Sequence, residues 1–258
     1  MHPSHIHSQI LRQILAFQKD IYAKEAGRTP VVLDNYINEF SKSENTVRLL
    51  FDHVNFKVLH VSDNVQHVLG YPVKDFMEST MLFPPKLFTS EHCNFLYVWL
   101  QWAFSCHYKH GNCDKSRQIM CGIKVKHREG HIMRLLFRQF CLEKTAEGLP
   151  IISAISLNDI SHLMNVDFYW GRIESGDENN TIHYLISTDK KDVPYDIFTE
   201  REKDILRYLA QNIESKEIAK QLFISHHTVD NHRRNMLNKI GARDTTALVQ
   251  ICKMTGII

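Results

Sequence analysis

Residues 224–242, near the end of the chain, carry polar side chains that can hydrogen-bond to the edges of DNA bases. Asparagine can make two hydrogen bonds to adenine and arginine two to guanine, each worth about 1–3 kcal/mol of discrimination against a wrong base. Asn231 and Arg234 supply both side-chain types at a spacing that places them on one face of a helix. We therefore expect a helix whose outward face reads bases in the major groove of double-stranded DNA.

The charge around this stretch favours the same chemistry. Between Lys216 and Arg243 there are six Lys or Arg residues against Glu217 and Asp230, a local net charge of +4, whereas the whole chain carries +2. Positive side chains neutralise backbone phosphates and release their counterions. The residues expected to contact DNA are His226, His227, Thr228, Asp230, Asn231, Arg233, Arg234 and Lys239. Arg233 is expected to contact phosphates, and therefore to contribute equally to the binding of every DNA sequence.

Capping signals predict three short helices that position this face. Thr199 and Glu202 form a T-x-x-E capping box at the start of the first helix. Ser215 is predicted to cap the second helix and Ser225 the third, which ends at Gly241. Three short helices with a tight turn before the third have the helix-turn-helix arrangement.

The apolar residues of these segments recur at helical spacing. The expected buried positions are Ile205, Leu206, Leu209, Ile218, Ala219, Leu222, Val229, Met236, Leu237 and Ile240. Asn212 follows the first helix, where a residue that tolerates left-handed dihedral angles can end it.

Residues 198–258 resemble the LuxR-type helix-turn-helix domain. The shared motifs are T-x-R-E, S-K-E-I-A, I-S-x-x-T-V-x-x-H-x-x-N and K-I-G. The resemblance implies an all-α, four-helix DNA-binding domain whose third helix reads the groove and whose fourth helix often mediates dimer contacts. Transferred to this chain, the fourth helix would dimerise through Thr246, Val249, Gln250 and Lys253.

The same resemblance implies base-facing positions at Asp230, Asn231 and Arg234, with His227, Thr228 and Lys239 nearer the DNA backbone. Two departures from the family pattern matter. Asp230 stands where the family usually has Lys, and Thr245 stands where it commonly has Arg. The target sequence therefore cannot be taken from relatives. Two alternatives for this segment are the DNA-binding end of an extracytoplasmic-type sigma factor and a helical bundle with a solvated polar face.

Length and composition bound the rest of the chain. With 258 residues, 43 % of them hydrophobic and 23 % charged, the chain has room for about two domains with sizeable cores. Six cysteines without a hydrophobic leader argue against a secreted disulfide scaffold. The most apolar window, residues 95–104, is too short to span a bilayer. We expect a soluble cytoplasmic protein with no membrane partner.

Residues 1–44 are expected to hold one amphipathic helix over 8–26 and a lead-in to the next domain. That helix must bury its apolar face on the following domain or on a second copy of the chain. His2, His5 and His7 have a spacing able to hold a metal, but a frayed terminus is the favoured interpretation.

Residues 45–165 change to short strand-like runs with turn signals. Two apolar runs flank a turn at 53–55, a long helix is predicted over 88–110, and three strand-like runs follow. The pattern predicts an α+β domain, an antiparallel sheet with helices on one face. This order and the segment F-K-V-L-H-V-S-D-N-V-Q-H-V-L-G-Y resemble the PAS domain. The resemblance implies a sensory or dimerising module with a pocket able to hold a small-molecule ligand.

The ligand itself is poorly specified by the sequence. Phe95, Trp99 and Trp102 are candidate pocket residues, although aromatic side chains on a long helix more often fill a core. Residues 106–113 read C-H-x-x-H-x-x-C, which contains zinc-binding side chains at a spacing that fits no standard zinc site. We predict a plain loop there, assign no metal site and name no cofactor.

Residues 166–197 are expected to form a hairpin followed by a linker at 189–194, ahead of the DNA-binding domain. The combined prediction is a sequence-specific transcription regulator that binds DNA as a homodimer and is controlled through its PAS-like domain. In the alternative, the PAS-like part is a constitutive protein-interaction module without ligand. The chain shows no P-loop, G-x-S-x-G or H-E-x-x-H motif, so we do not expect an enzyme.

Overall fold

The computed structural model describes residues 45–79, 83–88, 99, 118–145, 149–163, 169–174, 183–187 and 197–258. The described residues divide into two compact units. The first unit contains those up to Asp159, together with Ile173 and Glu174. The second contains Ile160–Arg172 and the described residues from His183 onward. The predicted helix over 8–26, the 106–113 loop and most of the predicted helix over 88–110 lie outside the described residues.

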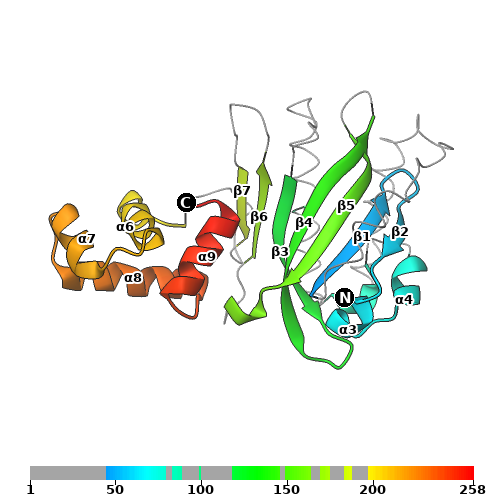
Figure 1. The fold of residues 1–258 in the computed structure, drawn as a ribbon, viewed down its shortest axis with the longest axis horizontal. Coiled ribbons are helices and arrows are strands. Elements are labelled where there is room, and N and C mark those ends of the chain that lie inside the picture. Colours follow the sequence, from blue (N-terminus) through cyan, green and yellow to red (C-terminus); the bar gives the residue numbers. More distant parts are fainter. Residues whose placement is uncertain are drawn as a thin grey trace, which may run out of the picture. The chain divides into compact units, whose positions relative to one another are not determined.

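The first unit is built on an antiparallel sheet, as predicted. Its strands are β1 (Thr46–Asp52), β2 (Lys57–Val61), β3 (Gln118–Lys126), β4 (Ile132–Lys144) and β5 (Pro150–Asp159). Their order is β2-β1-β5-β4-β3, and β6 (Tyr169–Glu174) and β7 (His183–Ser187) follow β3 in the same order (Figure 1). The first hairpin places β1 beside β2, and the central strand β5 pairs with both β1 and β4.

The sequence of the central strand, β5, is almost continuously apolar. The first six residues of β5 are all buried, so both faces of the strand are covered. A strand buried on both faces does not alternate between apolar and polar residues. Ser153, the polar exception among these six, is fully buried and accepts a hydrogen bond from Gln139 at 3.1 Å.

Three short helical segments follow β2, as the PAS resemblance implies. They are α3 (Val65–Leu69), α4 (Val73–Met77) and the 3-10 helix η2 (Pro85–Leu87). Phe76 of α4 lies edge-on to Phe83 at 6.5 Å between ring centroids, and Phe83 lies edge-on to Phe137 of β4 at 6.3 Å. This row of rings attaches the helical segments to one face of the sheet.

Three residues of the N-x-x-x-x-L-G-Y segment, residues 64–71, have identifiable structural roles. Asn64 donates from Nδ2 to the Thr46 carbonyl at 3.1 Å, which fixes the end of β2 beside β1. The Tyr71 hydroxyl donates toward the carbonyl oxygens of Lys86 and Lys126, at 3.2 and 3.1 Å. Gly70 ends α3 with a φ of 77°, in the left-handed region that glycine tolerates best.

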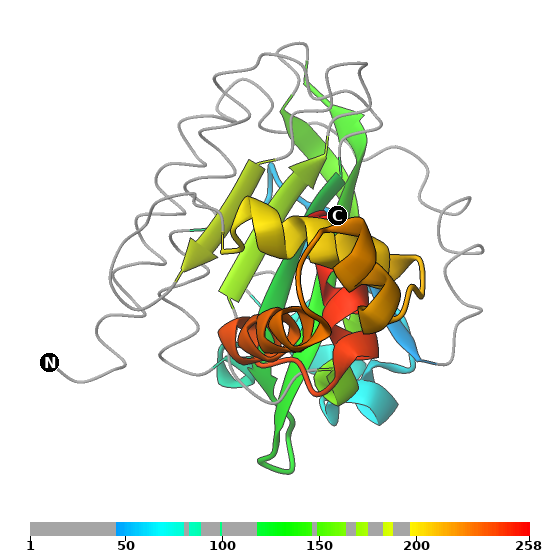
Figure 2. The ribbon, with the colours of Figure 1, turned by 90° about the vertical axis from the view of Figure 1, so that its left-hand side faces the viewer.

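Among the described residues, the second unit contains four helices and a short 3-10 turn. They are η3 (Ser161–Leu163), α6 (Glu200–Ala210), α7 (Ser215–Gln221), α8 (His226–Ile240) and α9 (Thr245–Thr255) (Figures 1 and 2). Helix α8 packs against α6, α7 and α9. Ile205, Leu206, Ile218, Val229, Met236, Ile240, Leu248 and Ile251 are fully buried. The predicted fold class, an α+β domain followed by an all-α four-helix domain, is confirmed.

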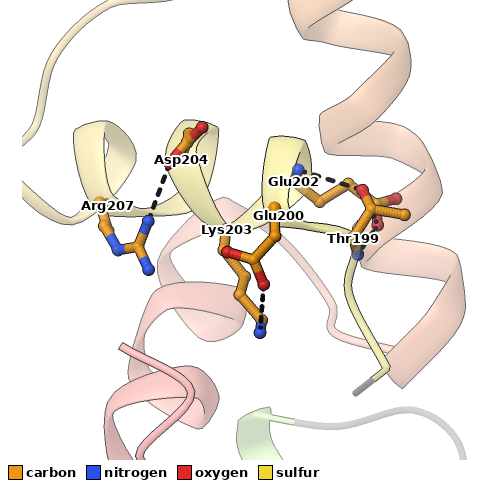
Figure 3. A network of polar contacts seen from close by, with 6 residues as sticks. All are labelled: Thr199, Glu200, Glu202, Lys203, Asp204 and Arg207. Carbon is orange, nitrogen blue, oxygen red and sulfur yellow. Dashed lines mark hydrogen bonds and ion pairs between the residues drawn. The ribbon is translucent and has the colours of Figure 1, made fainter.

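Most of the predicted helix ends are confirmed. The Thr199 hydroxyl accepts from the Glu202 N–H at 3.3 Å while the Glu202 carboxylate accepts from the Thr199 N–H at 2.8 Å (Figure 3). The Ser225 hydroxyl accepts from the Thr228 N–H at 3.0 Å. Gly241 and Asn212 both adopt left-handed dihedral angles, with φ of 61° and 59°.

The prediction that Ser215 caps α7 is wrong. Glu214 occupies the N-cap position without a side-chain cap, and Ser215 is the first helical residue. Its hydroxyl donates instead to Asp230 of α8 at 2.8 Å. The Ser215 hydroxyl therefore joins α7 to α8, whereas local capping rules assign it to α7 alone. None of the helices in the described part of the chain has the length and apolar character needed to cross a membrane.

We predict that Gly70→Ala destabilises the first unit by about 3 kcal/mol or more. An added Cβ would lie 2.7 Å from His127 Cε1 and 2.9 Å from Arg128 Cβ, in addition to the strain of a φ of 77°. Gly130→Ala is the matched control, because its φ is 101° but the nearest atom, Lys126 Cε, is 4.0 Å away. Urea unfolding should show a clearly larger loss for Gly70→Ala. Equal losses would mean that backbone strain alone matters at Gly70.

A candidate nucleic-acid interface on helix α8

Helix α8 has one buried and one exposed face. Val229, Met236 and Ile240 have no exposed surface, as the periodicity predicted. Leu237 and Leu222, also predicted to be buried, are only half-buried. Spacings of three and four residues place the remaining polar side chains on the opposite side. The exposed residues of the helix are His226, His227, Asn231, Arg234, Asn235, Asn238 and Lys239.

Few of the positive charges near this face are unpaired. Lys220 pairs with Glu217 at 3.0 Å and Arg243 with Asp244 at 3.1 Å. Within residues 197–258, only Lys216 and Arg234 of the six cations counted from the sequence have no hydrogen-bond or ion-pair partner. The Arg234 guanidinium is therefore available to an external acceptor beside the exposed amide of Asn231.

Arg233 lies at the junction of three helices. Its Nη1 donates to Ser215 of α7 at 2.9 Å and to Asp230 of α8 at 3.2 Å. Its Nη2 donates to the Thr245 hydroxyl, in the first turn of α9, at 2.8 Å. These contacts use one side chain to orient α8 against both neighbours. The predicted phosphate contact of Arg233 must compete with this network.

Asp230 belongs to the same network and is half-buried. The hydrogen bond from Ser215, with the nearby Arg233 guanidinium, lowers the pKa of the Asp230 carboxyl below its usual range. Asp230 is thus an anion held by its own domain at neutral pH. Asp230 and Thr245, the two residues that depart from the family pattern, both accept hydrogen bonds from Arg233. One network therefore accounts for both departures.

Lys239 is also engaged inside the domain. Its ammonium contacts both carboxylate oxygens of Glu202, at 2.9 and 2.7 Å, and lies 5.8 Å from the ring centre of Phe198. Burial alone would raise the pKa of Glu202, but hydrogen bonds from Lys239 and Thr199 outweigh it and hold the pKa below its usual range. The pair joins the start of α6 to the end of α8.

Helix α9 also has two faces. Ala247, Leu248, Ile251 and Cys252 are buried against the domain. Of the predicted dimerisation residues, Thr246, Gln250 and Lys253 are exposed and Val249 is half-buried. Val249 and Gln250 both lie three or four residues from Thr246 and from Lys253, so the four residues form a single outward strip. Asp244 caps the helix by accepting from the Ala247 N–H at 2.8 Å.

The segment 160–172 contacts α9 within the second unit. The Arg243 N–H donates to the Leu163 carbonyl at 3.4 Å, and η3 packs against α9. Arg172 directs Nη1 toward the carbonyl oxygens of Lys253 and Met254, at 3.5 and 3.4 Å. A guanidinium at the last turn of a helix also interacts favourably with the helix dipole.

Of the three predicted ligand-binding residues, only Trp99 is described; Phe95 and Trp102 lie outside the described residues. Trp99 is 2 % exposed and forms a hydrogen bond with the Cys121 thiol. Burial raises the pKa of Cys121 far above its usual range, so the thiol stays protonated and unreactive. Trp99 therefore lies in the core beside β3.

Comparison with known proteins agrees with the geometry of the helical unit. Residues 196–252 match the family described as bacterial regulatory proteins, luxR family. The chain is 39 % identical over 59 residues to the spore germination protein GerE of Bacillus subtilis, covering 22 % of this chain and 80 % of that protein. The chain belongs to the luxR family.

Two response regulators are similar to shorter parts of the chain. The nitrate/nitrite response regulator NarP of Escherichia coli is 46 % identical over 54 residues, which are 21 % of this chain and 25 % of that protein. The Haemophilus influenzae homologue is 41 % identical over 63 residues, covering 24 % of this chain and 30 % of that protein. The match thus covers about a quarter to a third of the length of these two regulators.

Two solved structures are similar over longer spans at low identity. One is the VqmA dimer of Vibrio cholerae, described as a LuxR-type receptor, with a TM-score of 0.35 and 16 % identity over 88 % of this chain and 89 % of that one. The other is a PAS domain from Colwellia psychrerythraea, with a TM-score of 0.37 and 12 % identity over 50 % of this chain and 98 % of that one.

Two kinds of residue were missed by the sequence analysis. Asn235 and Asn238 extend the exposed face of this luxR-family helix, and their spacing of four and seven residues from Asn231 could have identified them. Ser215 and Glu202 act across helices, and no local pattern indicates such contacts. Only the packed domain brings Glu202 to Lys239, 37 residues away.

We predict that Glu202→Gln lowers the free energy of unfolding by about 1–2 kcal/mol at pH 7, a figure reduced for the partial exposure of Lys239. The folded-state pKa of Glu202 is lowered, so its stabilisation is present above the unfolded pKa of about 4.3 and is lost as the pH falls below it. Thermal unfolding of both proteins between pH 7 and pH 3 should therefore converge at the acidic end. A constant difference across that range would contradict the ion pair.

Proposed function

We propose that this chain is a sequence-specific DNA-binding transcription regulator that inserts the N-terminal half of α8 into the major groove. The observation that carries the proposal is the exposed face of α8, where Asn231 and Arg234 are free of partners within residues 197–258. Both side chains can make two hydrogen bonds to a base edge. The proposal places the protein in the cytoplasm, where it has access to DNA.

Base reading is assigned to Asn231 and Arg234, and positioning to Asp230 and Arg233. Asp230 accepts hydrogen bonds from Ser215 and Arg233 at Oδ1, so its carboxylate is oriented by its own domain. His226, His227 and Thr228 lie in the first turn of α8, where the positive end of the helix dipole favours a phosphate. Lys239 is assigned mainly to its ion pair with Glu202.

The proposed active form is a homodimer joined through α9. The strip formed by Thr246, Val249, Gln250 and Lys253 is repeated in a two-fold partner, so the same patch would meet its copy. Two recognition helices held in this way would bind half-sites roughly 34–36 Å apart, one turn of DNA. VqmA is described as a dimer that binds target DNA, and we propose a comparable state here.

Control is assigned to the PAS-like unit, with boundaries of 45–165 for this domain, 166–197 for the hairpin and linker, and 198–258 for the DNA-binding domain. Leu163 and Arg172 contact the α9 end of the helical unit, and we propose that a change in the PAS-like unit reaches the dimerising helix through them. A ligand can do this only if it binds the two states with different affinity. Another VqmA structure is described as bound to DPO, and we propose that this chain also responds to a small molecule.

We predict that Asn231→Ala and Arg234→Ala each weaken binding to a selected site by about 5- to 150-fold, equivalent to about 1–3 kcal/mol. The site would first be selected from random duplexes with the full chain, and affinities measured by fluorescence anisotropy at one fixed salt concentration. Arg207→Ala on α6 is the matched control, because Arg207 is exposed and pairs only with Asp204 at 2.8 Å within residues 197–258. If the control lost as much affinity as the α8 variants, the assignment of the groove to α8 would be wrong.

The double substitution Thr246→Glu and Gln250→Glu should shift the chain toward monomer, because four carboxylates would meet across a two-fold α9 interface. Both residues are exposed, so the fold of the domain should be unchanged. Analytical ultracentrifugation would measure the dimer dissociation constant, and we expect at least a tenfold increase. Lys216→Glu, also exposed, should leave it unchanged. Unaltered dimerisation in the double variant would assign the interface to another surface.

A further inference from the structure

The hairpin between β3 and β4 brings together two histidines and a glutamate. His127, Glu129 and His131 each offer one metal-binding atom, and these atoms lie within 4.8 Å of one another. The turn is closed by the Gly130 N–H donating to the His127 carbonyl at 2.8 Å and by the His127 N–H donating to the His131 carbonyl at 2.9 Å. The backbone therefore holds the three residues at one end of the hairpin.

The position of the His127 ring is fixed by its surroundings. His127 is 8 % exposed, and its Cε1 and Nε2 edge lies so close to Gly70 that a Cβ there would be 2.7 and 2.8 Å away. The opposite nitrogen, Nδ1, faces Glu129: it lies 3.2 Å from the Glu129 backbone nitrogen and 3.8 Å from its carboxylate. An incoming ion would have to displace only this one long hydrogen bond to reach the Nδ1 lone pair.

The other two side chains can move toward that lone pair. Glu129 is 80 % exposed at its side chain, and His131 is exposed with its ring stacked on His127 at 4.3 Å between centroids. Zinc bonds of about 2.0–2.1 Å in tetrahedral geometry place donor atoms roughly 3.3 Å apart. To bind the same ion, the His131 ring has to leave its stack on His127 and turn one nitrogen toward the ion, because a metal lies in the plane of each imidazole that binds it. The exposed positions of His131 and Glu129 leave room for these movements.

We propose that His127, Glu129 and His131 form a binding site for a divalent transition-metal ion of the zinc type, with solvent in the fourth position. Two imidazoles and one carboxylate are a donor set that zinc and related ions use, whereas magnesium prefers oxygen ligands throughout. The hairpin is already attached to the end of α3, because the Arg128 N–H donates to the Leu69 carbonyl at 3.2 Å. The site lies in the first unit and does not depend on the DNA-binding proposal.

The test compares zinc binding by the unmodified chain with zinc binding by its variants. This comparison is needed because the chain has sixteen histidines and six cysteines, and those outside the proposed site can also bind metal. Metal-free full-length protein would be titrated calorimetrically with ZnCl₂ and NiCl₂, and with MgCl₂ for comparison. We expect His131→Ala to lose one bound equivalent of zinc and Glu129→Gln to bind that equivalent at least tenfold more weakly. His67→Ala, an exposed histidine on α3, should match the unmodified chain.

Thermal unfolding supplies a second readout of the same site. Saturating zinc should raise the melting temperature of the unmodified chain and of His67→Ala by several degrees, but raise that of His131→Ala by less. Both ligand substitutions are at exposed positions, so the variants should fold. If His131→Ala and Glu129→Gln kept the stoichiometry, the affinity and the thermal shift, zinc would bind elsewhere and the proposed site would be refuted.

Discussion

The orientation of α8 depends on the Arg233 guanidinium. This group contacts Ser215, Asp230 and Thr245, which belong to α7, α8 and α9. Apolar burial holds α8 in the domain but is not directional, whereas a planar guanidinium with fixed donor directions also specifies its rotation. Rotation about the helix axis decides which side chains face outward. The identity of the exposed face therefore follows from this polar contact as much as from the buried stripe.

The same contacts reduce the number of side chains that are free to bind DNA. Arg233 and Lys239 satisfy carboxylates of their own domain, which leaves Arg234 and Lys216 as the unpaired cations among those near α8 within residues 197–258. Discrimination between sequences would then rest on few charged groups and several neutral amides, including Asn231, Asn235 and Asn238. A dimer adds a second copy of each contact, so modest recognition by one domain is sufficient when α9 fixes the spacing.

Local sequence rules predicted the helices well because caps and apolar periodicity act over three or four residues. Thr199 with Glu202, Ser225 and Gly241 all lie where those rules place them. The errors and omissions occur where a side chain has a distant alternative partner: Ser215 binds Asp230, 15 residues away, instead of capping α7. In the sheet, strand-forming runs were recognisable, but the position of β5 between β1 and β4 is set by pairing across the whole unit. The His127–His131 cluster depends on a hairpin register in the same way.

The central claim is that the outward face of α8, and no other surface, contacts bases. A photo-crosslinking amino acid placed at position 227, in the exposed N-terminal half of α8, and separately at position 253 on α9, measures this directly against a selected duplex. The proposed arrangement predicts crosslinks to the duplex from position 227 and none from position 253. Crosslinking from α9 with none from α8 would contradict it.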